Sequence, residues 1–284
     1  MIGVTCAGGK TGKAIISHLA GHGKKVRAIV RHPKSLENIR DFGAVELVAC
    51  DLSDREGLDR AFHGLEQLYY IAPNMDPNEY SFGLNVLASC IEVGIKKIVF
   101  HSMLHTQIQA LPHHFERSRV EEEIINSGLK FVILQCGSYM QNMLPSWSKM
   151  LETGIHSMPY DADTSMSLVD LKDVCEVAEE TLHSNEYDFG MFEIAGTPIT
   201  MIEKASILSE ILGREIKPKK TDLEEVLAHA RSMGFSEYAL NSLKQMFPYY
   251  DRHGLIASSK SLENILGRKP TDFRTFVKNI SDIQ

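Results

Sequence analysis

The chain has 284 residues and a formal net charge of −7 at pH 7, from 30 Lys and Arg against 37 Asp and Glu. This mild acidity argues against direct nucleic-acid binding, because phosphate recognition needs a clustered basic surface. Hydrophobic residues make up 43% and charged residues 24%, which is typical of a globular protein and excludes a disordered chain.

No apolar run approaches the roughly 20 residues that a membrane-spanning helix needs, and the N-terminus lacks the pattern of a secretory signal. The five cysteines show no paired spacing and indicate reduced thiols. We therefore expect a cytoplasmic protein without a membrane partner.

The first 135 residues alternate short β-rich runs with amphipathic helical stretches. Strands alternating with helices predict a doubly wound parallel sheet of the Rossmann type, with ligands at the carboxyl edge of the strands. The expected strands are 2–5, 25–30, 45–49, 68–71, 97–101 and 130–134, and the clearest helices are 11–22, 79–93 and 116–126.

After residue 135 the alternation weakens. We expect a dinucleotide-binding domain over 1–150, to which 166–195 returns, and a smaller, mostly helical cap domain over 196–284. The pattern predicts a loop at 154–164, helices at 171–182, 202–212 and 235–247, a strand at 189–195, and a helix that Asp222 opens.

A glycine-rich loop between the first strand and the first helix is the strongest local signal. Gly9 and Gly12 fit the last two positions of a Gly-x-x-Gly-x-x-Gly fingerprint, in which glycines let the backbone approach a pyrophosphate at a helix N-terminus. An NTPase loop would need glycine where Val4 stands. The expected pyrophosphate contacts are Cys6, Gly8, Gly9, Lys10, Thr11 and Gly12.

Arg31 and Lys34 follow the second strand, at the position that faces the adenosine ribose in this type of fold. An acidic residue there would repel a 2′-phosphate, whereas the planar guanidinium suits one. We therefore expect NADP(H) to be preferred over NAD(H). Asp51 and Leu52 follow the third strand and are expected at the adenine, and Ala72 and Pro73 follow the fourth, beside the ribose and pyrophosphate.

The chain resembles the NmrA-like family, an atypical branch of the short-chain dehydrogenase/reductase superfamily, over nearly its whole length. The resemblance implies NADP(H) binding and a C-terminal domain that closes a substrate cleft. Some members are reductases of quinones, dyes or aromatic compounds, and others are redox sensors or regulators. It rests on the glycine loop, residues 26–31, 50–52, 92–99 with Ser102, 121–124 with 127–129, Tyr139 with 142–144, 167–170 and 212–214.

The chain departs from the pattern of this superfamily at its catalytic positions. Ser102 stands at the usual serine, but His113 and Arg117 stand where Tyr-x-x-x-Lys is common. His can donate a proton, and Arg117 can hold ribose hydroxyls or cofactor phosphate. Tyr139 is a second candidate donor, or it packs the cap. The alternative for His113 is a cleft-edge or solvated residue in a loop.

Four further patterns bear on the site. Glu121–Glu123 are interpreted as a solvated helix face and not as a metal cluster. His101 and His105 have helical spacing but lie at a strand end, and His113 and His114 have no Cys or carboxylate partner at recognisable ligand spacing, so we expect no metal. Cys6 replaces the first glycine of the fingerprint, and a thiol near a helix N-terminus would tend towards thiolate; the alternative is a small buried residue. Gln135 and Cys136 replace an Arg-Pro pair after the sixth strand and are expected to alter the cleft wall beside the nicotinamide.

Two functions remain open. The first is an NADPH-dependent reductase of quinone-like or other small conjugated carbonyl acceptors. The second is a non-catalytic NADP(H)-binding redox sensor that docks a regulatory protein. The partner is accordingly a small-molecule acceptor or a protein, and a homodimer is possible in either case.

Overall fold

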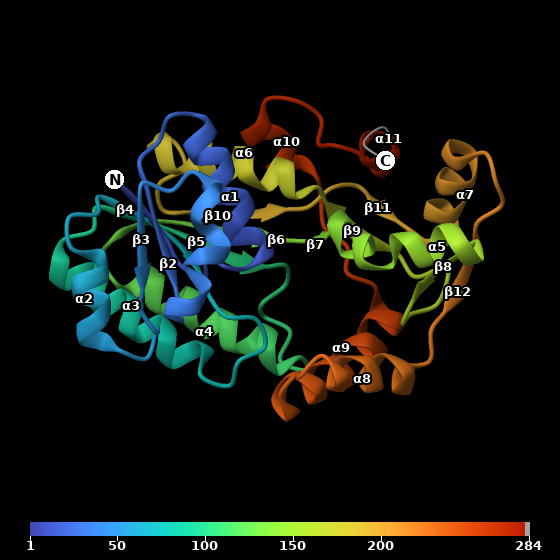
Figure 1. Ribbon diagram of the computed structural model, residues 1–284, viewed down its shortest axis with the longest axis horizontal. Helices are drawn as coiled ribbons and strands as arrows, with labels where there is room; N and C mark the ends of the chain where they lie inside the picture. Colours follow the sequence, from blue (N-terminus) through green and yellow to red (C-terminus); the bar gives the residue numbers. More distant parts are fainter. Residues whose placement is uncertain (282–284) are drawn as a thin grey trace. The chain divides into compact units, whose positions relative to one another are not determined.

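A computed structural model describes residues 1–281 and divides the chain into two compact units (Figure 1). Unit 1 comprises Met1–Gln135 and Val174–Phe192, and unit 2 comprises Cys136–Asp173 and Glu193–Gln284. Residues 136–150, which the sequence analysis placed with the first domain, group with unit 2 because β7 (Ser138–Tyr139) pairs with β9 (Met166–Val169) in a small sheet there.

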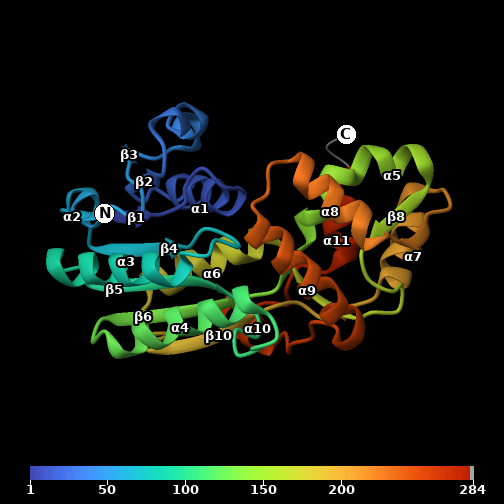
Figure 2. The same cartoon turned by 90° about the horizontal axis from the view of Figure 1, so that it is seen from below.

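Unit 1 is built on a seven-stranded sheet in the order β10-β6-β5-β4-β1-β2-β3. The pairs from β3 to β5 are parallel, which confirms the predicted doubly wound arrangement. Figure 2 shows β4, β5, β6 and β10 side by side. The strands are β1 (Ile2–Val4), β2 (Val26–Val30), β3 (Glu46–Ala49), β4 (Gln67–Ile71), β5 (Lys97–Met103), β6 (Lys130–Cys136) and β10 (Gly190–Ile194).

Helices cover both faces of this sheet, as parallel strands require. In Figure 1, α2, α3 and α4 lie below the strands, and α1 and α6 lie above them. The helices are α1 (Lys10–Gly21), α2 (Arg55–Phe62), α3 (Glu79–Val93), α4 (Pro112–Asn126) and α6 (Leu171–His183), with short 3-10 turns η1 (Pro33–Ser35) and η2 (Glu37–Phe42) after β2.

The main core of unit 1 lies between the sheet and helices α2, α3 and α4. Tyr70 and Phe100 stack there with ring centroids 5.0 Å apart, and both are fully buried. The helices contribute the buried side chains of Phe62, Val86 and Ile124 to this core. Such burial stabilises the unit by roughly 1.5–3 kcal/mol for each large side chain.

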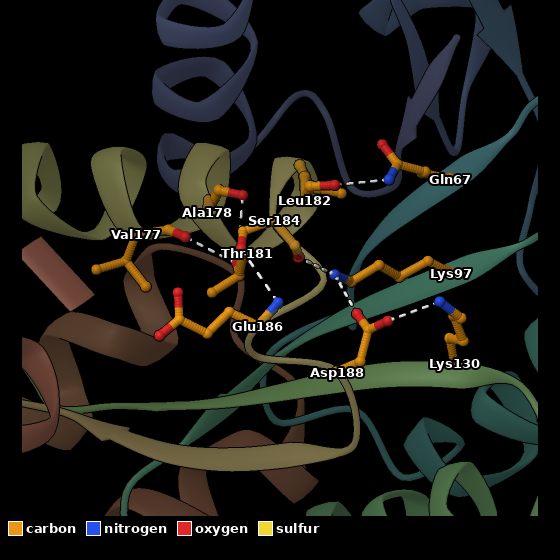
Figure 3. Close-up of polar contacts among 10 residues, drawn as sticks. All are labelled: Gln67, Lys97, Lys130, Val177, Ala178, Thr181, Leu182, Ser184, Glu186 and Asp188. Carbon is orange, nitrogen blue, oxygen red and sulfur yellow. Dashed lines mark hydrogen bonds and ion pairs between the residues drawn. The ribbon is translucent and has the colours of Figure 1, made fainter. Parts of the chain in front are cut away.

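A buried polar cluster fixes the returning segment 174–192 to unit 1 (Figure 3). The Lys97 ammonium, which is 3% exposed, lies 2.5 Å from the Asp188 carboxylate and donates to the Ser184 carbonyl at 2.7 Å. Lys130 binds the other Asp188 oxygen at 2.9 Å, and Gln67 donates to the Leu182 carbonyl. These contacts join the end of α6 and the start of β10 to strands β4, β5 and β6.

Unit 2 is smaller and mostly helical, as predicted, and it also contains two short sheets, β11-β9-β7 and β12-β8. Buried Asp173 accepts hydrogen bonds from Arg268 and from the Thr271 backbone and hydroxyl, which fixes the turn before α11. The elements not yet given are η3 (Met140–Ser146), α5 (Trp147–Thr153), β8 (Ile155–Met158), β11 (Pro198–Ile199), α7 (Met201–Leu212), β12 (Lys217–Lys220), α8 (Leu223–Ser232), α9 (Glu237–His253), α10 (Lys260–Leu266) and α11 (Phe273–Ser281).

The loop predicted over 154–164 is wrong in its first part, because β8 pairs in parallel with β12 there. β12 is a Lys-Pro-Lys-Lys segment in which every residue is exposed, so it carries no apolar pattern that indicates pairing. The helix at Asp222 is confirmed, since this side chain caps α8 by accepting from the Glu224 N–H. Within residues 1–281, every helix falls short of the length and apolarity that crossing a bilayer requires.

Candidate functional site

The glycine loop connects β1 to α1 at the carboxyl edge of the sheet in unit 1. Hydrogen bonds from the Ala7 N–H to the Ile29 carbonyl (3.1 Å) and from the Gly9 N–H to the Cys6 carbonyl (3.0 Å) hold it. The N-cap of α1 is Gly9, which has no side chain with which to cap the first turn. That geometry is the one in which helix N-termini bind phosphate.

Of the glycines in this loop, Gly12 is the one that close packing requires. A Cβ built on it would lie 2.6 Å from the Cys6 carbonyl oxygen and 2.7 Å from the Cα of Ala7, both backbone atoms. Gly9 has a looser neighbourhood, with 3.4 Å to its nearest atom, and Gly8 approaches only the side chains of Val30 and Ser35. Close packing of α1 on the loop therefore depends on Gly12.

Cys6 adopts a left-handed backbone conformation, with φ of +47°. Glycine populates this region without steric cost, which explains why the fingerprint has glycine at this position. Burial raises the pKa of the Cys6 thiol to about 11, against weaker lowering by the charges of Arg117 and Arg31. The expected tendency towards thiolate is therefore wrong, and Cys6 is a protonated thiol at neutral pH.

Arg31 and Asp51 lie at the neighbouring ends of β2 and β3. Arg31 is exposed and hydrogen-bonds His32 through its Nε at 3.0 Å. Asp51 accepts from the Ser53 hydroxyl and N–H, which lowers the pKa of Asp51, and the charge of Arg31 lowers it further. The structure thus brings Arg31, Asp51 and the glycine loop to one edge of unit 1, with Leu52 buried behind them.

Arg117 on α4 is 4% exposed and forms an ion pair with Glu79 on α3, which is fully buried. Its Nη1 donates to the His101 carbonyl at 2.9 Å, and its Nη2 lies 3.5 Å from the carbonyl of Pro73, the residue after buried Ala72. Arg117 therefore joins α3, α4 and the ends of β4 and β5. Its contact with a ribose stays a prediction.

Ser102 belongs to a buried polar cluster that we call the Glu121 network: Ser102, Thr106, Glu121 and Gln135. The Glu121 carboxylate, on a residue 4% exposed, accepts from the Ser102 hydroxyl at 2.5 Å and from the Thr106 hydroxyl at 2.8 Å. Gln135 Nε2 donates to both carboxylate oxygens, at 3.1 and 3.0 Å. The Ser102 hydroxyl is thus engaged as a donor to the Glu121 carboxylate.

The interpretation of Glu121–Glu123 as a solvated helix face is wrong for Glu121. Only Glu122 is exposed, and Glu121 turns towards β5 and β6. The signal that could have found it is its spacing of four residues from Arg117, which places both side chains on one face of α4. Gln135, noted only as a departure, completes the same network.

His113 is not in a loop but in the first turn of α4, where it is 2% exposed. Burial lowers the pKa of His113 to about 3, and the neighbouring His114 ring, 4.5 Å away, lowers it further. Among residues 1–281 its Nδ1 has no hydrogen-bond partner. His113 is therefore neutral at physiological pH and cannot act as an imidazolium acid there.

Tyr139 forms part of β7 and belongs to unit 2, whereas Ser102, His113 and Arg117 belong to unit 1. Its role as a proton donor to a ligand of unit 1 stays a prediction. Lys10 and Thr11 form the first positions of α1, directly after the loop.

We compared the chain with known protein families. The model of the NmrA-like family matches residues 1–278. The chain belongs to the NmrA-like family. This membership confirms the resemblance drawn from the glycine loop and the segments around it.

Proteins similar to this chain include an oxidoreductase and a transcriptional regulator. Quinone oxidoreductase 2 of Escherichia coli (strain K12) is 23% identical over 286 residues, covering 100% of this chain and 99% of that protein. The crystal structure of the NADPH-dependent quinone oxidoreductase from Escherichia coli with NADPH aligns with a TM-score of 0.83, covering 99% and 100% of the two chains at 23% identity. NmrA, a negative transcriptional regulator solved with NADP, aligns with a TM-score of 0.82 at 16% identity, covering 99% and 95%. At these identities the structural likeness shows the NmrA-like fold.

Proposed function

We propose that this NmrA-like protein is an NADPH-dependent reductase of quinone-like or other small conjugated carbonyl compounds. The observation that carries the proposal is the edge of unit 1 where the Gly12-dependent loop, exposed Arg31 and Asp51 come together. Full-length similarity to a quinone oxidoreductase, and 22% identity over 284 residues to an NAD(P)H azoreductase of Xenophilus azovorans, support the same reaction class.

The residues of this edge fit a phosphorylated dinucleotide. The loop N–H groups and the first turn of α1 would hold the pyrophosphate, and Arg31 would pair with the 2′-phosphate. Asp51 and Leu52 would border the adenine. When bound, the nicotinamide supplies the hydride, so the protein's own task is to position the acceptor and exclude water.

The chemistry of unit 1 favours an acceptor that needs no strong acid. Ser102 directs its proton to Glu121, His113 is neutral, and Arg117 is paired with Glu79. A quinone accepts a hydride to give an aromatic hydroquinone anion, which then takes its proton from water. A simple ketone would instead develop an alkoxide that requires a donor at the site.

The test is steady-state oxidation of NADPH with a panel of quinones, an azo dye and a simple ketone, followed by loss of NADPH absorbance. We expect turnover with quinones that is at least tenfold faster than with the ketone. A protein that binds NADPH tightly and oxidises it with none of these acceptors would contradict the reductase.

The cofactor preference has its own prediction. Arg31→Ala is expected to weaken NADPH binding by about 10- to 100-fold, because it removes a charge-assisted contact of about 1.5–3 kcal/mol. Binding of NADH, which has no 2′-phosphate, should change less than threefold. Titration calorimetry with both cofactors checks this, and Lys25→Ala, which changes the residue before β2 at the end opposite Arg31, is the matched control. An equal loss of affinity for NADPH and NADH would show that Arg31 supports the fold and does not bind the 2′-phosphate.

A non-catalytic NADP(H) sensor is the second candidate. The state of the catalytic positions supports it, because Ser102 donates to Glu121, His113 is neutral and Arg117 is paired with Glu79. Such a sensor requires a difference in affinity between NADPH and NADP⁺, because a ligand shifts a conformational equilibrium only by its differential affinity. Its partner would be a protein and not a small acceptor.

A further inference from the structure

Helices α1 and α6 of unit 1 bring together three side chains of the kind that bind transition metals. His18 lies in the last turn of α1, His22 is the C-cap residue that follows this helix, and Glu179 lies on α6. His18 Nε2 is 2.8 Å from Glu179 Oε2, and His22 Nδ1 is 3.0 Å from the same oxygen. One potential ligand atom from each residue lies within 4.8 Å of the others.

The spacing of these atoms is close to that of a metal site. Zinc–nitrogen and zinc–oxygen bonds of about 2.0–2.2 Å in a tetrahedral site place neighbouring ligand atoms roughly 3.4 Å apart. The observed nitrogen–oxygen distances of 2.8 and 3.0 Å therefore need to lengthen by only about half an ångström to admit an ion.

The surroundings permit an ion to enter. The His22 side chain is 55% exposed, Glu179 23% and His18 14%, so water can fill a fourth position. Lys24 lies 3.7 Å from Glu179 Oε1, the oxygen that neither histidine contacts, and its side chain is 32% exposed. The Lys24 ammonium therefore lies on the other carboxylate oxygen and leaves Oε2 to the ion.

We propose that His18, His22 and Glu179 form a binding site for a divalent transition ion of the Zn²⁺ type. Two imidazoles and one carboxylate are ligands that Zn²⁺, Ni²⁺ and Cu²⁺ accept, whereas Mg²⁺ and Ca²⁺ prefer oxygen alone. The site is independent of the proposed reductase activity. An ion there links the helix that begins at the glycine loop to α6 and stabilises unit 1.

Sequence analysis could not find this site, because His18 and His22 are separated from Glu179 by more than 150 residues. The i, i+4 spacing of the two histidines on a helix was the only local signal. It becomes informative only once α6 is packed beside α1 (Figure 1).

The test uses tag-free full-length protein from which metals have been removed by a chelator. Zn²⁺ titration calorimetry should give one ion per chain at low micromolar or tighter affinity, and Co²⁺ should give the visible absorption of a tetrahedral site. Zn²⁺ should raise the midpoint of thermal unfolding in proportion to the logarithm of its concentration, because it binds only the folded state.

His22→Ala and Glu179→Gln should each weaken Zn²⁺ binding at least tenfold and abolish the Co²⁺ spectrum. His22 is largely exposed, so its replacement leaves the fold intact, which circular dichroism verifies. His63→Ala, which changes an exposed histidine elsewhere in unit 1, is the matched control and should bind as the parent does. No Zn²⁺ binding below 1 mM, or equal binding by the His22 and His63 variants, would overturn the proposal.

Discussion

Arg117→Ala is expected to lower the free energy of unfolding by about 3–5 kcal/mol, because it leaves the Glu79 carboxylate buried without its partner. Glu79 is fully buried, and Arg117 also donates to the carbonyl of His101. Chemical denaturation followed by circular dichroism measures the change. The denaturant midpoint should fall sharply while the slope of the transition stays constant.

Two variants separate a structural role of Arg117 from a role in binding cofactor. Replacing the pair together, as Arg117→Met with Glu79→Leu, should recover most of the lost stability, since an apolar pair of similar volume carries no desolvation penalty. The recovered protein then shows whether NADPH affinity depends on the guanidinium. Arg117→Ala within 1 kcal/mol of the parent in stability, but with NADPH binding lost, would contradict the structural role and assign Arg117 to the cofactor.

Gly12→Ala is expected to abolish most dinucleotide binding, with NADPH affinity reduced about 100-fold or more. The added Cβ would meet two backbone atoms at 2.6 and 2.7 Å, so α1 and the loop must move apart. The movement takes the N–H groups away from the pyrophosphate, and losing two charge-assisted hydrogen bonds at about 1.5 kcal/mol each gives this factor. Overpacking should also destabilise the fold by about 1–3 kcal/mol.

Gly21→Ala is the matched control for Gly12, because it changes a glycine of the same helix. Nothing lies within 4 Å of a Cβ built on Gly21, so this variant should bind NADPH normally and be as stable as the parent or more so. Calorimetry and denaturation on the two variants make the comparison. Gly12→Ala with parental NADPH affinity would show that the cofactor does not use this loop.

The sequence predicted the parts of unit 1 that depend on local pattern. β-rich runs alternating with helices led to the parallel sheet, and glycine spacing led to the loop before α1. It did not predict the β8–β12 pair, because the Lys-Pro-Lys-Lys strand is held by backbone hydrogen bonds and has no buried face. A strand with no buried face leaves no hydrophobic periodicity to detect.

The catalytic positions show a second limit of sequence analysis. Their residue types were visible, but their chemical states depend on partners far along the chain. Ser102 stands at the usual serine position, yet its hydroxyl donates to Glu121, which was interpreted as part of a solvated helix face. His113 was considered as a donor, yet burial keeps it neutral. Burial and long-range hydrogen bonds decide such states, and neither is encoded in local spacing.

We propose that the glycine loop and Arg31 bind NADP(H) for hydride transfer. The decisive experiment is a calorimetric titration of the purified protein with NADPH, NADP⁺, NADH and NAD⁺. Both phosphorylated forms should bind more tightly than NADH and NAD⁺, with NADPH and NADP⁺ bound within about tenfold of each other. A much larger difference between the two redox states would favour the sensor, and no binding of any of the four would show that the loop does not hold a dinucleotide.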